Sequence, residues 1–194
     1  HIYNNGSGNS LSGILNKGNT TVDTKQKSSY EKLERNAGQL QKRADNLAAK
    51  GESSLYAKAS ENKDTEEVCK EVQALVEDYN STMKILQSTS GPLNDYYRQM
   101  LQEAATENSK SLANVGITVS KDGKLTVDSE KLKAADIDTL EKVLGSSGGF
   151  TSKVSFLAGR VSDNAQAGTK SLTSQYGANG SLYTAAGGKY SFWG

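Results

Sequence analysis

Two long stretches of the chain carry apolar residues at alternating spacings of three and four, and this pattern limits most strongly what the sequence can fold into. Such spacing places the apolar side chains on one face of an α-helix, as in a coiled coil. The first stretch holds Tyr30, Leu33, Ala37, Leu40, Ala44 and Leu47, and the second holds Val68, Val72, Leu75, Tyr79, Thr82 and Leu86. Two long amphipathic helices are therefore predicted. An antiparallel pair within the chain is the simplest arrangement that buries both faces.

The first apolar face has a second interpretation, as a contact surface for another molecule. Large exposed apolar surfaces are rare on monomers, so this face needs a partner that the sequence does not name. We keep Tyr30, Leu33, Leu40 and Leu47 as candidate interaction residues. Because small and aromatic residues interrupt the stripe, we expect only weak self-association. Replacing Leu33 and Leu40 by Asp is expected to abolish it without unfolding the chain.

Further helices follow the second stripe. Pro92 ends that helix, because proline lacks a backbone donor and keeps the residue before it out of the helical region. A third helix is predicted from about Leu93 to Glu107, and a last one from Phe150 to about Gly168. Capping-box spacing of Asp64 with Glu67 predicts where the helix of the second stripe begins, and the same spacing of Asp138 with Glu141 predicts the start of a short later helix. Asp128 is expected to cap another short helix.

Residues 115–128 alternate apolar and polar on both sides of a turn signal, which predicts a β-hairpin. A two-residue turn would pair Val119 with Thr126 and divide the apolar residues between two faces. A three-residue turn over 121–123 keeps them on one face, with Val119 opposite Leu125 and Ile117 opposite Val127. Since a slip of one residue reverses the face of a strand, we predict the three-residue turn, with Gly123 left-handed in a bulge. An isolated hairpin is marginal in water, so this one should pack on the helices.

Composition divides the chain into three parts. Only five of the 19 glycines lie between residues 28 and 144, and apolar residues make up 35% of the whole. Residues 1–27 form a polar leader, expected to be mobile because its few apolar residues cannot offset the entropy of ordering it. Residues 28–167 form the predicted helical body, and residues 168–194 form a flexible tail rich in Gly, Ser and Tyr. The expected fold class is mainly α, with an antiparallel bundle of long helices and one hairpin packed on them.

The order of these elements resembles the C-terminal segment of bacterial flagellar hook-associated protein 2, the filament cap protein family. The similarity covers about residues 65–168 and is densest in and around the hairpin. It rests on Tyr79-Asn80, Gly91-Pro92-Leu93, Leu112-Ala113-Asn114-Val115-Gly116-Ile117-Thr118, Asp122-Gly123-Lys124-Leu125-Thr126-Val127-Asp128, Leu132 and Ala134-Ala135. In this family a long C-terminal helix pairs with the N-terminal one, whereas a Gly/Tyr-rich tail is expected at that place in this chain.

The resemblance implies a structural protein of the bacterial flagellum, exported without a cleavable signal peptide and acting outside the cell. Family members form oligomers at the filament tip, beneath which flagellin subunits insert. A cap-like or hook-associated protein would act by self-assembly or by docking onto filament or hook proteins. Those proteins, or further copies of the chain itself, are the partners that the resemblance implies.

Few residues are suited to catalysis or metal binding. The only histidine is His1 and the only cysteine is Cys69, so histidine-based triads, Cys-His dyads and histidine-rich metal sites are excluded. Asp122 and Asp128 lack the spacing of a calcium loop. We expect no catalytic, cofactor-binding or metal-binding residues and no enzymatic activity. A net charge of +1 gives no broad attraction for nucleic acid, and no apolar run has the length of a membrane span.

The tail holds an internal repeat, because Tyr176, Tyr183 and Tyr190 recur every seven residues, with Trp193 close behind. Tyrosine and tryptophan supply large contact area at low entropic cost, which is typical of adhesive segments. A solvated, extended tail explains the composition equally well. The alternative function is therefore a surface adhesin or adaptor that binds a partner through these aromatic residues. A self-associating chain in solution would favour the flagellar interpretation over this one.

Overall fold

The computed structural model describes the backbone of residues 2–178 and the side chains of residues 24–173. The chain divides into two compact units. The central unit is Lys32–Asn164, and the terminal unit holds the flanking segments up to Glu31 and from Ala165.

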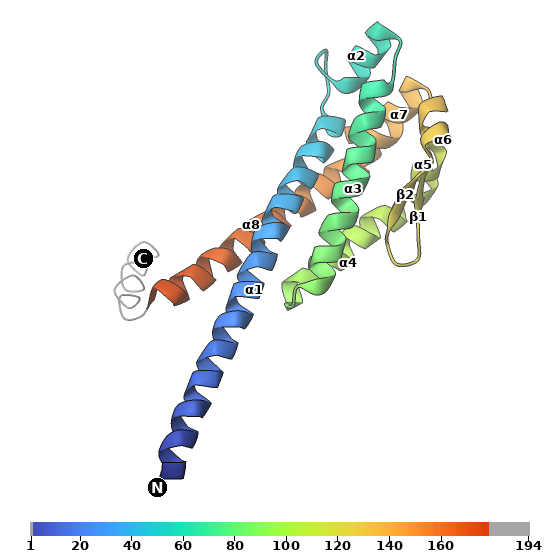
Figure 1. Cartoon of the computed structure of the whole chain (residues 1–194). Coiled ribbons are helices and arrows are strands. Elements are labelled where there is room, and N and C mark those ends of the chain that lie inside the picture. The colour runs from blue at the N-terminus through green and yellow to red at the C-terminus, as the bar shows by residue number, and fades with distance from the viewer. Residues whose placement is uncertain (1, 179–194) are drawn as a thin grey trace. The chain divides into compact units, whose positions relative to one another are not determined.

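The described residues form eight α-helices, one short 3-10 turn and one hairpin of two antiparallel strands (Figure 1). The predicted fold class, mainly α with a single hairpin, is confirmed. The elements are α1 (Ile2–Ala48), α2 (Leu55–Asn62), α3 (Glu66–Ser88), α4 (Pro92–Glu107), α5 (Ser109–Asn114), β1 (Ile117–Val119), β2 (Leu125–Val127), α6 (Ser129–Ala134), α7 (Ile137–Leu144), η1 (Ser146–Gly148) and α8 (Phe150–Ala178).

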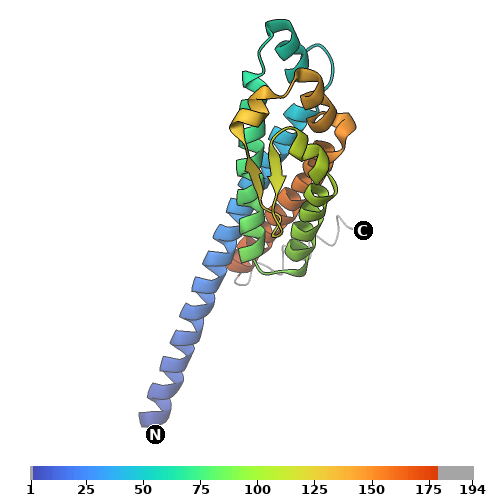
Figure 2. The same cartoon turned by 90° about the vertical axis from the view of Figure 1, so that its right-hand side faces the viewer.

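The two apolar stripes form much of the core of the central unit. Every member of the second stripe is fully buried, and so is every member of the first from Leu33 onward. Helices α1 and α3 run in opposite directions within this unit (Figures 1 and 2). Arg43 of α1 pairs with Glu71 of α3 at 2.9 Å, and Asn46 donates to the same carboxylate at 3.1 Å. The antiparallel pair within the chain is therefore the arrangement that the stripes adopt.

Helix α8 also packs antiparallel to α1 in the central unit. Asp45 accepts a hydrogen bond from Ser155, and the carbonyl of Glu34 accepts one from Ser162 at 3.3 Å. Between these contacts, a Cβ built on Gly159 would lie 2.8 Å from Nε2 of Gln41, so the helices approach closely. The buried face of α8 is the predicted one, with Phe150, Val154, Leu157 and Val161.

Both long terminal helices extend further than the sequence predicts. Helix α1 begins at Ile2, so the predicted boundary of the leader at residue 28 does not coincide with a change in backbone structure. Helix α8 continues through Gly168 and ends at Ala178. Extending an existing helix by one residue is far easier than nucleating one, which explains why polar and glycine-containing segments continue it. The rest of the predicted tail, residues 179–194, lies outside the described residues.

The hairpin has the predicted register. Val119 faces Leu125 and Ile117 faces Val127, and the φ angle of Gly123 is +84°. The turn closes where the backbone N–H of Ser120 donates to the Lys124 carbonyl at 2.9 Å. Ile117 and Leu125 are buried and the other two apolar residues are half-buried, so the shared apolar face packs on the helices.

Two of the three predicted helix starts are displaced. Helix α7 is capped by Asp136, whose carboxylate accepts from the Thr139 N–H at 2.7 Å, so the predicted Asp138 lies inside the first turn. This bond holds the pKa of Asp136 below its usual range. At α3 the residue before the helix is Thr65, whose side chain makes no capping bond, while Asp64, one position earlier, accepts from the Glu66 N–H at 2.9 Å. Asp128 caps α6 as predicted.

Candidate functional site

Three of the predicted interaction residues lie in the core of the central unit. Leu33, Leu40 and Leu47 have no exposed surface, so the prediction that they form an intermolecular contact face is wrong for this fold. The reason is that α3 and α8 supply the partner surface that the sequence left unnamed. Tyr30 lies in the terminal unit and is half-buried, with its ring against the backbone of Gly168.

The aromatic residues of the predicted tail cannot be placed. The backbone of Tyr176 belongs to α8, and its side chain lies outside the described residues. Tyr183, Tyr190 and Trp193 lie outside them altogether.

The described side chains include few chemically reactive groups. No three His, Cys, Asp or Glu residues among them gather closely enough to hold a metal ion. The thiol of Cys69 is buried in α3, with its sulfur 3.9 Å from the carbonyl oxygen of Leu132. No helix in the described part of the chain combines the length and the apolar character that crossing a membrane requires.

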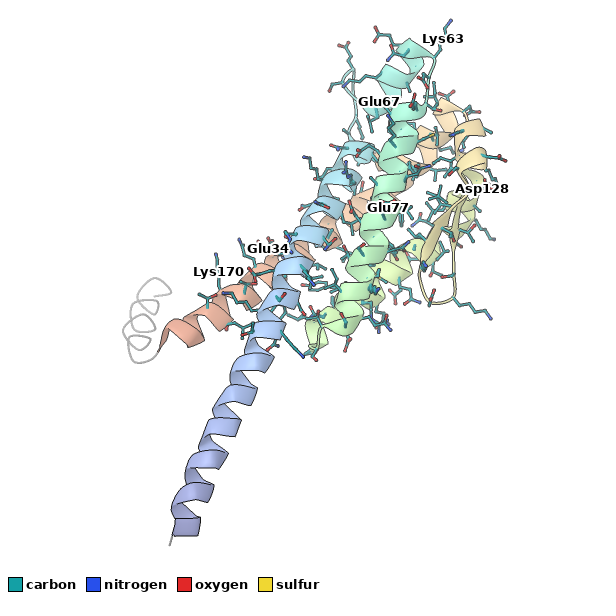
Figure 3. The ribbon with its side chains drawn as sticks, viewed as in Figure 1. Glu34, Lys63, Glu67, Glu77, Asp128 and Lys170 are labelled. Atoms are coloured by element: carbon teal, nitrogen blue, oxygen red, sulfur yellow. The ribbon has the colours of Figure 1, made fainter. Side chains whose placement is uncertain are left out.

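Arg43 joins two acidic residues of α3. Its Nη1 lies 2.9 Å from Glu71, whereas its Nε lies 3.6 Å from Asp78, which is within ion-pair range and too far for a hydrogen bond. Burial raises the pKa of Asp78 above its usual value, and the nearby positive charge of Arg43 opposes that rise only in part. This cluster ties α1 to α3, and it leaves Oδ2 of Asp78 without a hydrogen-bond partner among the described residues. Other carboxylates of α3, such as Glu67 and Glu77, are exposed (Figure 3).

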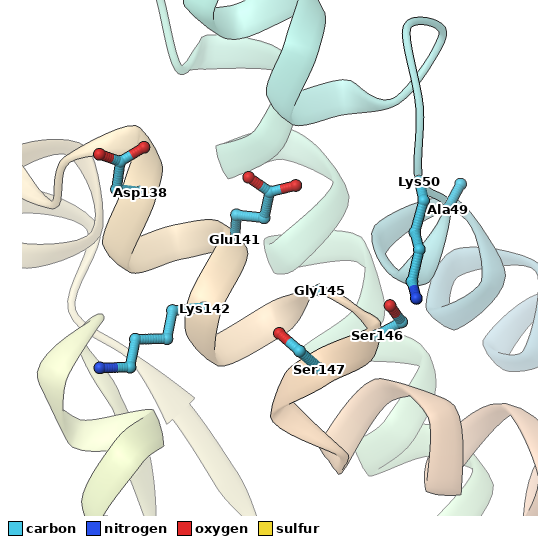
Figure 4. Close-up of a pocket in the computed structure, with 8 residues that line it drawn as sticks. All are labelled: Ala49, Lys50, Asp138, Glu141, Lys142, Gly145, Ser146 and Ser147. Atoms are coloured by element: carbon cyan, nitrogen blue, oxygen red, sulfur yellow. The ribbon is translucent and has the colours of Figure 1, made fainter.

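One open depression, with a volume of about 440 Å³, lies where α7 and the η1 turn meet the segment after α1 (Figure 4). Its charged residues are balanced, with Lys50 and Lys142 against Asp138 and Glu141. Two positive and two negative side chains give the depression no preference for a ligand of either sign.

One amide side chain of α3 binds the hairpin through two hydrogen bonds. Asn80 accepts a hydrogen bond from the Leu125 N–H at 3.0 Å and donates one to the Leu125 carbonyl at 2.8 Å. In the observed register the backbone groups of Leu125 point away from β1, because Ser120 and Lys124 form the neighbouring hydrogen-bonded pair. Asn80 therefore occupies the place of another strand at the outer edge of β2.

A second contact fixes the tip of the hairpin on α4. Gln102 donates from Nε2 to the carbonyl of Lys121 at 3.2 Å, and a Cβ built on Gly123 would lie 2.8 Å from Cγ of Gln102. The turn itself is braced by Asp122, which accepts from the hydroxyl of Ser120 and from the Lys124 N–H. These bonds lower the pKa of Asp122.

These two contacts create a pocket of about 420 Å³ between the hairpin tip, α3 and the first turns of α4. We call it the basic pocket. Its charged residues are Lys84, Arg98, Lys124 and Asp122, and its other residues include Asn80, Met83, Gln87 and Gly123. Three cations thus face one carboxylate, and that carboxylate is already engaged within the turn.

Four buried polar atoms of α3 and α4 have no hydrogen-bond partner among the described residues: Asp78 Oδ2, Thr82 Oγ1, Asn94 Oδ1 and Arg98 Nε. A buried polar atom without a partner typically costs about 1–3 kcal/mol. Of the four residues, only Arg98 lines the basic pocket. It also makes no ion pair with any described residue, so its guanidinium is the least satisfied charged group of the site.

The basic pocket is not apparent from the sequence. Its cations lie on three elements and are separated by 14 and 26 positions, with nothing in the local pattern to mark them. Asn80 does lie in the segment that carries the family resemblance, but the resemblance by itself assigns no role to that residue.

Comparison with protein-family models, with curated proteins and with solved structures gives no match for this chain.

Proposed function

We propose that this chain is a structural, non-enzymatic protein of the flagellar cap or hook-associated type, which acts outside the cell by self-assembly or by docking onto filament components. The observation that carries the proposal is the antiparallel pairing of α8 with α1 in the central unit. The family that the sequence resembles pairs its C-terminal helix with its N-terminal one. At 29 residues α8 is also longer than predicted, which brings the chain closer to that arrangement.

The local structure around Gly116 supplies a second line of support. The Asp128 N–H donates to the Gly116 carbonyl at 2.8 Å, and a Cβ built on Gly116 would lie 2.8 Å from the Asp128 carbonyl oxygen. With a φ of +87°, this position also disfavours any side chain. The residues that carry the resemblance are thus residues that this hairpin needs, as expected if the resemblance reflects a shared local fold.

Sedimentation with filaments tests the proposal. The purified chain would be incubated with filaments assembled from flagellin of the same organism, pelleted, and located by gold-labelled antibody in electron micrographs. We expect the chain to pellet with the filaments and the label to mark their ends or their junction with the hook. A chain that stays in the supernatant, shows the mass of a monomer at all concentrations and is absent from flagella in cells would refute the proposal.

The same assay includes a variant for the adhesin or adaptor alternative, in which Tyr176, Tyr183, Tyr190 and Trp193 are replaced by Ser. A flagellar protein that docks through its helical body should still pellet with filaments after these changes. Attachment to another surface that disappears in this variant, without any filament binding by the unmodified chain, would favour the alternative function.

A further inference from the structure

The basic pocket has an excess of positive charge that the chain itself does not neutralise. Lys84 comes from α3, Arg98 from α4 and Lys124 from the hairpin. No described carboxylate lies within 4 Å of a nitrogen of these three side chains. Asp122, the acidic residue of the pocket, accepts its hydrogen bonds from the turn.

Arg98 provides the most specific observation. Its Nε is buried and has no hydrogen-bond partner among the described residues. Asp95 and Glu103 line a neighbouring depression together with Arg98, and neither is within ion-pair distance of it. A guanidinium presents its N–H groups as a planar fork that matches the two oxygens of a carboxylate. The two terminal nitrogens of Arg98 are not among the buried atoms and make no hydrogen bond with a described residue, so they are the part of the fork that can meet a ligand supplying such oxygens.

The walls of the pocket are held in place by the rest of the fold. Asn80 holds β2 at one side through both backbone groups of Leu125, and Gln102 holds the hairpin tip through Lys121. Met83, which also lines the pocket, is buried. The cations are thus carried on elements that already have their own contacts, so little ordering is needed when a ligand binds.

We propose that the basic pocket is a docking site for a carboxylate side chain on an acidic segment of a partner protein, with Arg98 as the bidentate donor and with Lys84 and Lys124 as supporting charges. The site goes beyond the flagellar proposal and does not depend on it, because its evidence is confined to the pocket. Its size suits one or two side chains of a partner, and most of the residues that line it are polar or charged.

Titration of the full chain with a fluorescein-labelled hexaglutamate peptide tests the site by fluorescence anisotropy. We expect saturable binding that weakens when NaCl is raised from about 0.05 to about 0.5 M, and little binding of the matched hexaglutamine peptide. Arg98→Gln should weaken binding about tenfold or more, because a charge-assisted hydrogen bond is lost. The double variant Lys84→Gln plus Lys124→Gln should weaken it to a similar extent.

The control is Lys110→Gln plus Lys133→Gln, which removes the same charge from two exposed lysines that do not line the pocket. It should bind as the unmodified chain does, and circular dichroism of every variant checks folding. If Arg98→Gln does not fold, the NMR resonance of the Arg98 Nε–H in the unmodified chain tests the site instead. This resonance should shift when the hexaglutamate peptide is added.

Three results would overturn the proposal. Equal loss in the control and pocket variants would show that binding is only nonspecific attraction to positive charge. A bound peptide that leaves the Arg98 resonance unmoved would exclude the pocket. Displacement by tripolyphosphate, combined with no binding of hexaglutamate, would identify the site as one for phosphate and not for carboxylate.

Discussion

Two glycines of the central unit, Gly123 and Gly38, are expected to affect stability in opposite ways when a side chain is added. Gly123 has a φ of +84° in the hairpin turn, where an L-residue is strained, and a Cβ there would also press on Gln102. Gly38 lies inside α1, and a Cβ there would meet Ser162 Oγ at 3.8 Å, an ordinary contact distance. The backbone conformation and the available space both distinguish the two positions.

Alanine at each of these positions should shift stability in opposite directions. Gly123→Ala should destabilise the chain by about 1 kcal/mol or more, because the left-handed conformation disfavours a Cβ. Gly38→Ala should stabilise it by about 0.5–1 kcal/mol, because the unfolded chain loses freedom and the helix gains a better former. Urea unfolding of the two variants measures both changes. A Gly38→Ala variant that is less stable than the unmodified chain would contradict the spacing between α1 and α8 at this position.

At the scale of elements, the hairpin shows how a short sheet is kept from exposing an edge. A lone two-stranded hairpin leaves its outer backbone groups to water or to another chain. Here Asn80 binds the N–H and the carbonyl of Leu125 on the outer side of β2. The junction with α6 is closed by Asp128, which caps that helix directly after the strand (Figure 3).

Removal of the Asn80 side chain should loosen the hairpin. Asn80→Ala leaves both backbone groups of Leu125 without their partner, which should cost about 1–3 kcal/mol in the free energy of unfolding. Hydrogen exchange at the Leu125 amide should accelerate at the same time. The matched control is Gln73→Ala, also on α3, which removes one exposed hydrogen bond to Ser129 and should change stability by less than about 0.5 kcal/mol. Equal effects of the two variants would contradict the role of Asn80 in holding β2.

The whole central unit depends on the face of α1 that the sequence left without a named partner. Leu33 and Leu40 are fully buried there, whereas Phe156 on α8 is 66% exposed. An apolar stripe of this kind can be satisfied by a second molecule or by the chain itself, and the structure shows the second solution. Any self-association must therefore use other surfaces.

The double variant Leu33→Asp plus Leu40→Asp should consequently unfold the central unit, in contrast to the outcome expected from the sequence. Each carboxylate placed in this core costs several kcal/mol, and a domain has only about 5–15 kcal/mol of stability in total. Phe156→Asp is the control and should change stability by about 0.5 kcal/mol or less. Loss of the helical circular dichroism signal measures the outcome. A double variant that stays folded would show that this stripe is not core.

The sequence by itself determined the features that depend on near neighbours. The helical stripes follow from spacing within a few turns, and the hairpin register follows from one turn and the requirement that apolar residues share a face. The position of Asp128 as a cap is equally local. Where two competing local signals were close together, as at Asp136 and Asp138, spacing alone chose the wrong residue.

Only the tertiary structure decided which surfaces meet. Whether the stripe of α1 faces α3, α8 or another molecule depends on the free energy of the whole packed unit, and no local pattern encodes it. Asn80 reaches Leu125 across 45 positions, and Lys84, Arg98 and Lys124 come together from three elements. Such contacts form because burial of the apolar faces brings distant segments together, and the polar groups then pair or remain unpaired according to where the backbone has placed them.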